Sequence, residues 1–163
     1  MISMIRIDDR LIHGQVAVMW SKELGISRII VPNEKIANNE MQKSALLMAA
    51  PSGVKAGVMT PSKTINILND PRAKDMKILV VANNPKDVYE VLKGINEKPR
   101  LNIANYGRIN GSLTGKQKIT ETVYLTNEDK EVLNEIFKMG YDFDYQPLPS
   151  DTKQSLKELM GGK

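Results

Sequence analysis

A short segment near the start of the chain contains the densest group of reactive side chains. From Asp8 to Gln15 the sequence reads DDRLIHGQ, with two carboxylates, one guanidinium and the only imidazole of the chain, that of His13. Free imidazole has a pKa of about 6.5, so part of it is neutral and nucleophilic in the cytosol. Such a nitrogen can accept a phosphoryl group, and the segment therefore indicates phosphoryl transfer at His13.

The residues beside His13 suit this chemistry. Phosphoryl transfer depends on positioning and charge neutralisation more than on covalent steps by the protein. Arg10 could act as a clamp on the phosphoryl oxygens, and a helix beginning near Gly14 would direct the backbone amides of Gly14 and Gln15 toward the phosphate. A lone histidine is often only a packing or capping residue, but Arg10, Gly14 and the position after a strand favour the functional interpretation.

Two adjacent carboxylates could bind magnesium or brace the loop. Neighbouring aspartates point in different directions, and aspartate in a turn usually accepts hydrogen bonds from backbone amides. We therefore expect Asp8 and Asp9 to brace the loop. With no cysteine and one histidine, no transition-metal site is expected, and the sequence indicates no cofactor. The chain has no G-x-x-x-x-G-K-[ST] loop, which argues against a nucleotide-dependent kinase.

Short apolar runs and amphipathic segments alternate along the first hundred or so residues. This alternation predicts an α/β fold, an open and mainly parallel twisted sheet with helices on both faces. Helical spacing of Val16, Met19, Trp20 and Leu24 predicts one stripe against the sheet, and Gly25 is expected to end that helix. The predicted strands are residues 2–7, 28–31, 54–59 and 77–82, and a further helix is predicted around residues 41–49.

After residue 99 the pattern changes. Short β-like stretches at residues 101–103, 116–119 and 122–125 lie between glycines and predict a few added antiparallel, hairpin-like strands. Thr126 and Asp129 have the spacing of a capping box ahead of a helix. Residues 141–145 predict a late strand, followed by a short C-terminal helix.

Composition limits the class of protein. A chain of 163 residues with 41% hydrophobic and 26% charged residues is expected to form one globular domain over residues 1–163. No leader or membrane-spanning run is evident, so a cytoplasmic location is expected. The net charge of +4 favours anionic partners, but scattered lysines and few aromatic residues do not indicate nucleic acid. The nine methionines are expected to fill the core.

The segment RIDDRLIHGQV, residues 6–16, together with Trp20, resembles the signature of the IIB component of the mannose, fructose and sorbose family of the bacterial sugar phosphotransferase system. The motif is long and chemically meaningful, and further matches extend the resemblance over essentially the whole chain. Those matches, in the expected order, are residues 27–31, 50–51, 53–54, 84–85 and 102–103.

The resemblance implies a phosphohistidine intermediate at His13, on Nδ1, with Arg10 as the phosphate clamp. The donor would be a separate phosphorylated IIA protein, and the acceptor a sugar bound by membrane IIC and IID subunits. A free-standing IIB protein would then be cytoplasmic and associate with the inner face of the cell membrane through IIC and IID. Ala104 stands where the family commonly has glycine, so the shape of the loop that follows is open, and Arg108 there is a candidate docking residue.

Several alternatives stay open at this point. Ser62 and Asn84, at the ends of later strands, could rim the pocket of His13 or simply cap helices. A non-catalytic, anion- or ligand-binding regulatory domain is the alternative function. The sequence does not identify the sugar or the IIA partner, and it leaves open whether the chain forms a homo-oligomer.

Overall fold

The computed structural model describes residues 1–108 and 112–161. Its main sheet has seven strands in the order β3-β2-β4-β1-β5-β8-β9, and every neighbouring pair is parallel except β8 with β9. This confirms the predicted fold class. The strands are β1 (Ile2–Asp8), β2 (Arg28–Pro32), β3 (Lys55–Met59), β4 (Ile78–Ala82), β5 (Leu101–Asn105), β8 (Phe143–Tyr145) and β9 (Gln154–Ser155).

Several helices begin or end at residues that the sequence marks as caps. The Asn84 side chain accepts a hydrogen bond from the backbone amide of Asp87, and Thr126 forms the predicted capping box with Asp129. Gly25 ends the first helix in the left-handed conformation. The helices are α1 (Gly14–Leu24), α2 (Glu34–Ala37), α3 (Glu40–Met48), α4 (Pro61–Asn69), α5 (Pro85–Gly94), α6 (Asn127–Lys138) and α7 (Leu156–Leu159), with a 3₁₀ helix at Pro71–Asp75.

Within the described part of the chain, none of these helices has both the length and the apolar character needed to cross a membrane.

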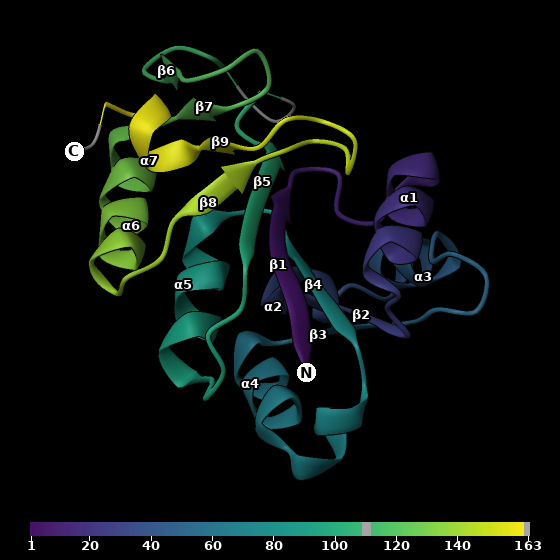
Figure 1. The fold of residues 1–163 in the computed structure, drawn as a ribbon. Helices are drawn as coiled ribbons and strands as arrows, with labels where there is room; N and C mark the ends of the chain where they lie inside the picture. The colour runs from purple at the N-terminus through teal and green to yellow at the C-terminus, as the bar shows by residue number, and fades with distance from the viewer. Residues whose placement is uncertain (109–111, 162–163) are drawn as a thin grey trace.

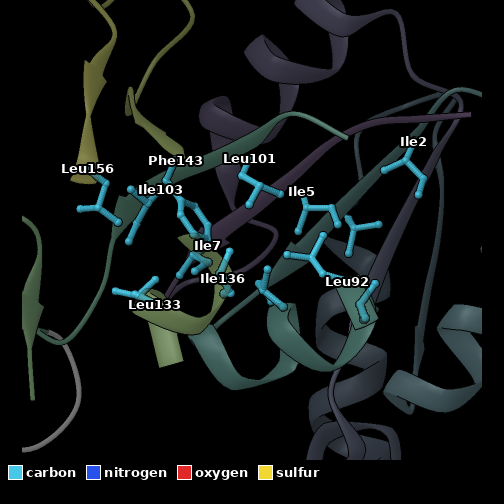
Figure 2. Close-up of a cluster of buried hydrophobic side chains, with 14 of the residues drawn as sticks. Ile2, Ile5, Ile7, Leu92, Leu101, Ile103, Leu133, Ile136, Phe143 and Leu156 are labelled. Carbon is cyan, nitrogen blue, oxygen red and sulfur yellow. The ribbon is translucent and has the colours of Figure 1, made fainter. Parts of the chain in front are cut away.

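The helices cover both faces of the sheet and create two apolar cores (Figure 1). One core holds residues of α4, α5 and α6 against one face, and Figure 2 shows Leu92, Leu133 and Ile136 of this cluster. The other core holds α1 residues, with Trp20 the largest, against the opposite face. β1 contributes to both, because successive side chains of a strand point to opposite faces.

The C-terminal half differs from the sequence-based prediction in two strands, β5 and the unpredicted β9. Residues 101–103 were expected in a hairpin-like addition, but β5 is a parallel strand beside β1 and lies inside the main sheet. The hairpin forms instead from β6 (Gln117–Lys118) and β7 (Tyr124–Leu125), which pair antiparallel. β9 adds the antiparallel edge of the main sheet.

Two predictions about apolar side chains were wrong. Met19 does not join the buried stripe of α1, since it is 38% exposed, and the buried positions of that helix are Ala17, Trp20 and Ser21. Methionines do not generally fill the core either, because Met41 and Met48 on α3 are 84% and 86% exposed. Flexible, polarizable methionine tolerates exposure where packing does not demand a fixed shape.

Candidate functional site

The β1–α1 loop, which runs between Asp8 and Gly14, lies at the carboxyl end of a central strand. β1 pairs with β4 on one side and β5 on the other, and its chain then turns into α1 (Figure 1). Ligands of open α/β sheets gather at this edge, beside the loops that lead into helices. The fold therefore places the reactive segment where open α/β sheets commonly bind their ligands.

His13 is the N-cap residue of α1. Its backbone is extended, with φ −153° and ψ 132°, and its side chain makes no capping hydrogen bond. Nδ1 lies 3.4 Å from the carbonyl oxygen of Leu11, which exceeds the usual length of an N–H···O bond. Nε2 is buried and has no hydrogen-bond partner among the described residues. The ring is thus half-buried and weakly tied.

The loop backbone is held in an unusual conformation. Leu11 has a φ of 58°, the one positive value at a described non-glycine residue, and Gly14 has a φ of 44°. A left-handed leucine costs roughly 1–2 kcal/mol. Burial of the Leu11 and Ile12 side chains in the α1-side core holds the loop in place. Strained backbone of this kind is concentrated at functional sites.

Arg10 faces solvent at the edge of the loop. Its backbone amide donates to Asp8 Oδ1 over 3.0 Å, and its Nε lies 3.8 Å from the same oxygen. The side chain is 46% exposed, so this ion pair is loose and the guanidinium is only weakly held by the fold. A cation in this position can reach an anion placed near the start of α1.

Asp8 and Asp9 accept hydrogen bonds on opposite sides of the loop. Asp8 is fully buried and accepts from Arg6 Nη2 at 3.1 Å as well as from the Arg10 amide. Asp9 Oδ2 accepts from the backbone amide of Gly107 at 2.9 Å, which ties the β1–α1 loop to the loop after β5. No group of three or more histidine, cysteine or acidic side chains suited to a metal ion occurs in the described residues.

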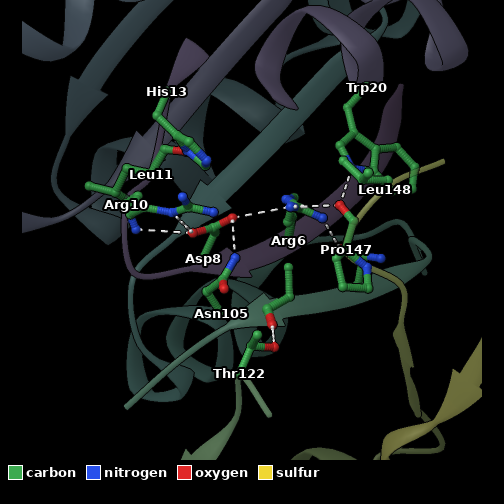
Figure 3. A network of polar contacts seen from close by, with 12 residues as sticks. Arg6, Asp8, Arg10, Leu11, His13, Trp20, Asn105, Thr122, Pro147 and Leu148 are labelled. Carbon is green, nitrogen blue, oxygen red and sulfur yellow. Dashed lines mark hydrogen bonds and ion pairs between the residues drawn. The ribbon is translucent and has the colours of Figure 1, made fainter. Parts of the chain in front are cut away.

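Arg6 is a component of the site whose signal in the sequence was not recognised outside the family motif. Its buried guanidinium donates to Asp8, to Asn102 Oδ1 at 2.6 Å and to the carbonyl of Pro147 at 3.1 Å, and it lies 5.4 Å from the ring centre of Trp20. Figure 3 shows Asp8 between Arg10 on one side and Arg6 on the other. Burial lowers the pKa of Arg6, and the neighbouring carboxylate of Asp8 opposes that shift. The sequence signal for the role of Arg6 was the presence of a charged residue within the otherwise largely apolar run of residues 2–7.

Ser62 and Asn84 lie together, but in a separate hollow. Both line a cavity of about 590 Å³ with Thr60, Lys86 and other residues near the starts of α4 and α5. No residue of the β1–α1 loop is among those lining it. Asn84 also caps α5, as the capping interpretation expected.

Arg108 lies on the surface beyond β5. Its Nη1 donates to the carbonyl of Glu121 at 3.1 Å, next to the segment that includes the hairpin β6–β7. Ala104, the residue that departs from the family pattern, is buried in β5. Part of the loop that follows, residues 109–111, lies outside the described residues.

Comparisons with known proteins identify the family of the chain. Residues 2–163 match the family model of the sorbose subfamily IIB component of the phosphotransferase system. A probable phosphotransferase enzyme IIB component of Streptococcus pyogenes serotype M6 is 39% identical, with 98% of this chain and 99% of the relative covered. The sorbose-specific EIIB component of Klebsiella pneumoniae is 33% identical, with coverage of 98% and 94%.

Solved structures show the same fold. The crystal structure of the IIB domain of the sorbose permease from Klebsiella pneumoniae superposes with a TM-score of 0.90 at 31% identity, covering 98% of this chain and 96% of that one. A further crystal structure, from Thermoanaerobacter tengcongensis, gives a TM-score of 0.85 at 27% identity over 99% and 95% of the chains. The chain therefore belongs to the sorbose-subfamily IIB components of the phosphotransferase system, the phosphoryl carriers of sugar uptake.

Proposed function

We propose that His13 is the residue on which this IIB component carries its phosphoryl group. The observation that carries the proposal is the position of the imidazole at the N-cap of α1, with the half-exposed Arg10 guanidinium in the same loop. Since His13 is the only histidine of the chain, no other imidazole can take this role.

Nδ1 is the proposed nucleophile. Nε2 is buried in the present orientation of the ring, so an incoming phosphorus atom cannot approach it directly. Nδ1 lies 3.4 Å from the Leu11 carbonyl, longer than an ordinary hydrogen bond, so this contact ties the nitrogen only weakly. The reactive tautomer of the neutral ring has its proton on Nε2 and its lone pair on Nδ1.

In the transfer step, the Nδ1 lone pair forms a bond to phosphorus. The bond between phosphorus and the donor's histidine nitrogen breaks, and its electron pair returns to that nitrogen, so no other reactant is needed. The phosphoryl oxygens then lie at the start of α1, where the amides of Gly14 and Gln15 and the positive end of the helix dipole stabilise negative charge. Arg10 adds a forked guanidinium donor.

The proposed donor is a phosphorylated IIA protein, and the proposed acceptor is the hydroxyl of a sugar held by membrane IIC and IID subunits. In that second step the hydroxyl oxygen attacks phosphorus, the bond to Nδ1 breaks, and the hydroxyl proton leaves to the sugar site. The chain would act as one IIB domain over residues 1–163, in the cytoplasm and at the inner face of the membrane.

The other predicted residues have supporting roles in the proposal. Asp8 and Asp9 brace the loop through the backbone amides of Arg10 and Gly107. Arg108 is exposed and is proposed to contact a docking partner. The cavity lined by Ser62 and Asn84 is proposed only as an outer rim of the docking surface, because it does not include the loop.

The test compares wild type with His13→Ala. Each protein is incubated with labelled phosphoenolpyruvate, the general carriers of the system and a IIA protein of this family, and the label on the chain is measured. His13 makes no capping bond and its Nε2 has no partner among the described residues, so the variant is expected to fold. Circular dichroism checks this.

We expect the wild type to acquire label and the folded variant to acquire none. Equal label on His13→Ala would overturn the proposal, as would binding of free phosphate by wild type with no covalent label, which is the behaviour of a ligand-binding domain.

A further inference from the structure

Arg6 is a buried cation placed directly behind the β1–α1 loop. Along β1, the Met4 side chain belongs to the α1-side core, whereas those of Ile5 and Ile7 belong to the opposite core. By the alternation of a strand, Arg6 shares the α1 side with Met4. Its side chain is only 4% exposed, so the guanidinium is removed from water beneath the candidate site.

The guanidinium joins three segments that are distant in the sequence. Nη2 donates to Asp8 Oδ2 at the start of the loop, and Nη1 donates to Asn102 Oδ1 on β5. Nη2 also donates to the carbonyl of Pro147, and the Asn102 amide donates to the carbonyl of Gln146 at 3.0 Å. The segment after β8 is thereby fixed against the end of β1.

The same carbonyl fixes α1. The indole nitrogen of Trp20 donates to Pro147 O at 3.0 Å, so Trp20 and Arg6 share one acceptor. The Arg6 guanidinium also lies over the Trp20 ring at 5.4 Å, a cation–π distance. The orientation of α1, which begins beside His13, therefore depends on the same group that holds Asp8.

The two oxygens of Asp8 face different arginines. Oδ2 accepts from Arg6 and, at 3.4 Å, from the side-chain amide of Asn105. Oδ1 accepts from the backbone amide of Arg10 and lies near its Nε. A buried ion pair is weak evidence for stability, because well-packed apolar residues of similar volume often serve as well. An apolar pair, however, could not orient the Asp8 carboxylate, which accepts the hydrogen bond from the Arg10 amide.

We propose that Arg6 is a positioning residue for phosphoryl transfer, which fixes the Arg10 side of the loop through Asp8 and the His13 side through Pro147 and Trp20. This inference rests on the proposed function of His13. Arg6 has no contact with the imidazole in this structure, so it acts through these partners. Misplacement of reacting groups by about 1 Å can cost on the order of a hundredfold in rate.

The test variant is Arg6→Lys, which keeps a charge but loses the fork that reaches Asp8, Asn102 and Pro147 together. The matched control is Arg100→Lys. Arg100 also lies over the Trp20 ring, at 5.7 Å, but its described side-chain partners are Asp144 and the Gln146 side chain rather than Asp8 or Pro147. Transfer from phosphorylated IIA is measured over a range of donor concentrations, and the phosphorylated residue is mapped in the same samples.

For Arg6→Lys we expect the transfer rate at saturating donor to fall by about tenfold or more, with the donor KM changed by less than about threefold. Arg100→Lys should stay within about twofold of wild type in both. The inference would be overturned if Arg6→Lys transferred at the wild-type rate at saturating donor, or if only its KM for the donor changed. Label on His13 in the same samples would leave the proposed function standing. Label on another residue would instead overturn the proposed function.

A second measurement needs no variant. Nitrogen–proton NMR spectra of wild type are compared before and after phosphorylation, with the side-chain signals of Arg6, Trp20 and Arg100 assigned. Arg6 Nη2 and the Trp20 indole nitrogen share the Pro147 carbonyl as acceptor, so the Arg6 Nη–H and Trp20 indole signals are expected to shift together. The Nε–H of Arg100, which donates to Asp144 instead, is expected to stay fixed. If the Arg6 and Trp20 signals do not move, the inference is wrong, whether or not Arg6→Lys folds.

Discussion

Replacing Arg10 by alanine separates the contribution of this side chain to folding from its contribution to transfer. The fold holds the guanidinium loosely, with Nε 3.8 Å from Asp8 Oδ1 and 46% of the side chain exposed. The backbone bond from the Arg10 amide to Asp8 does not involve the side chain and survives the substitution.

The two effects differ in size. An exposed ion pair contributes about 0.2–1 kcal/mol, and the 3.8 Å separation favours the lower end, so we expect a stability loss of about 0.5 kcal/mol or less. Loss of a buried transition-state donor costs about 10²–10³ in rate. Because water can replace part of a half-exposed group, we expect Arg10→Ala to slow transfer by about 10–100-fold, or roughly 1.4–2.7 kcal/mol.

The assay is rapid-quench transfer from phosphorylated IIA, with the free energy of unfolding measured by urea in parallel. The control is Arg72→Ala. Arg72 also forms an exposed ion pair, with Asp70, but it lies before the amino end of β4, whereas the β1–α1 loop follows the carboxyl end of β1. Transfer by Arg10→Ala at the wild-type rate would refute the clamp. A stability loss above about 2 kcal/mol would show that the side chain is bound more firmly than its exposure indicates.

Two further predictions concern the loop after β5. Gly107→Ala should lower the free energy of unfolding by about 2 kcal/mol or more, because at a φ of +85° its Cβ would lie 2.0 Å from the Tyr124 carbonyl oxygen. Gly14→Ala, whose Cβ meets no described atom within 4 Å, should cost about 1 kcal/mol; equal losses in urea would contradict this. The pKa of the Tyr106 hydroxyl is raised, chiefly by burial and secondly by its hydrogen bond to Asp129. The contribution of this hydroxyl to the free energy of unfolding is therefore complete below its unfolded pKa of about 10 and declines as the pH rises above that value. Tyr106→Phe should therefore be less stable than wild type by about 1 kcal/mol at pH 8, and the gap should close by about 1.4 kcal/mol per pH unit above about pH 10; a constant gap in urea melts would contradict the shift.

The central strands and the helix ends could be predicted because their signals are local. The apolar runs that became β1, β2 and β4 are nearly all buried, and each prediction is within one residue of the observed strand. Gly25 and Thr126 mark helix ends through their own backbone or side-chain bonds. The short helix α2 and the 3₁₀ helix were missed because one helical turn leaves little periodicity in a sequence.

The nature of β5 could not be predicted locally. The short β-like stretches separated by glycines suggested a hairpin-like strand at residues 101–103, yet the side chain of Asn102 in β5 is fully buried. Its partners are Arg6, 96 residues earlier in the sequence, and the carbonyl of Gln146, 44 residues later. Only the fold brings these groups together.

The candidate site likewise has a part that the sequence predicts locally and a part that only the fold assembles. His13, Arg10 and Gly14 lie in one segment, and their types and spacing alone indicated phosphoryl transfer at the start of a helix. The groups that orient that segment come from elsewhere, such as Gly107 and Pro147. These residues act through a backbone amide or carbonyl. Every residue can supply both groups, except that proline lacks the amide N–H, so the residue type gives no signal in the sequence.

The most direct test of the account is the chemical nature of the phosphate on the wild-type chain. After phosphorylation through IIA, the protein is divided and held in acid or in alkali, and the labelled peptide is identified at neutral pH. We predict that the label is lost in acid, survives alkali, and lies on the peptide that contains His13. Acid-stable label, or label on a peptide without His13, would contradict the account.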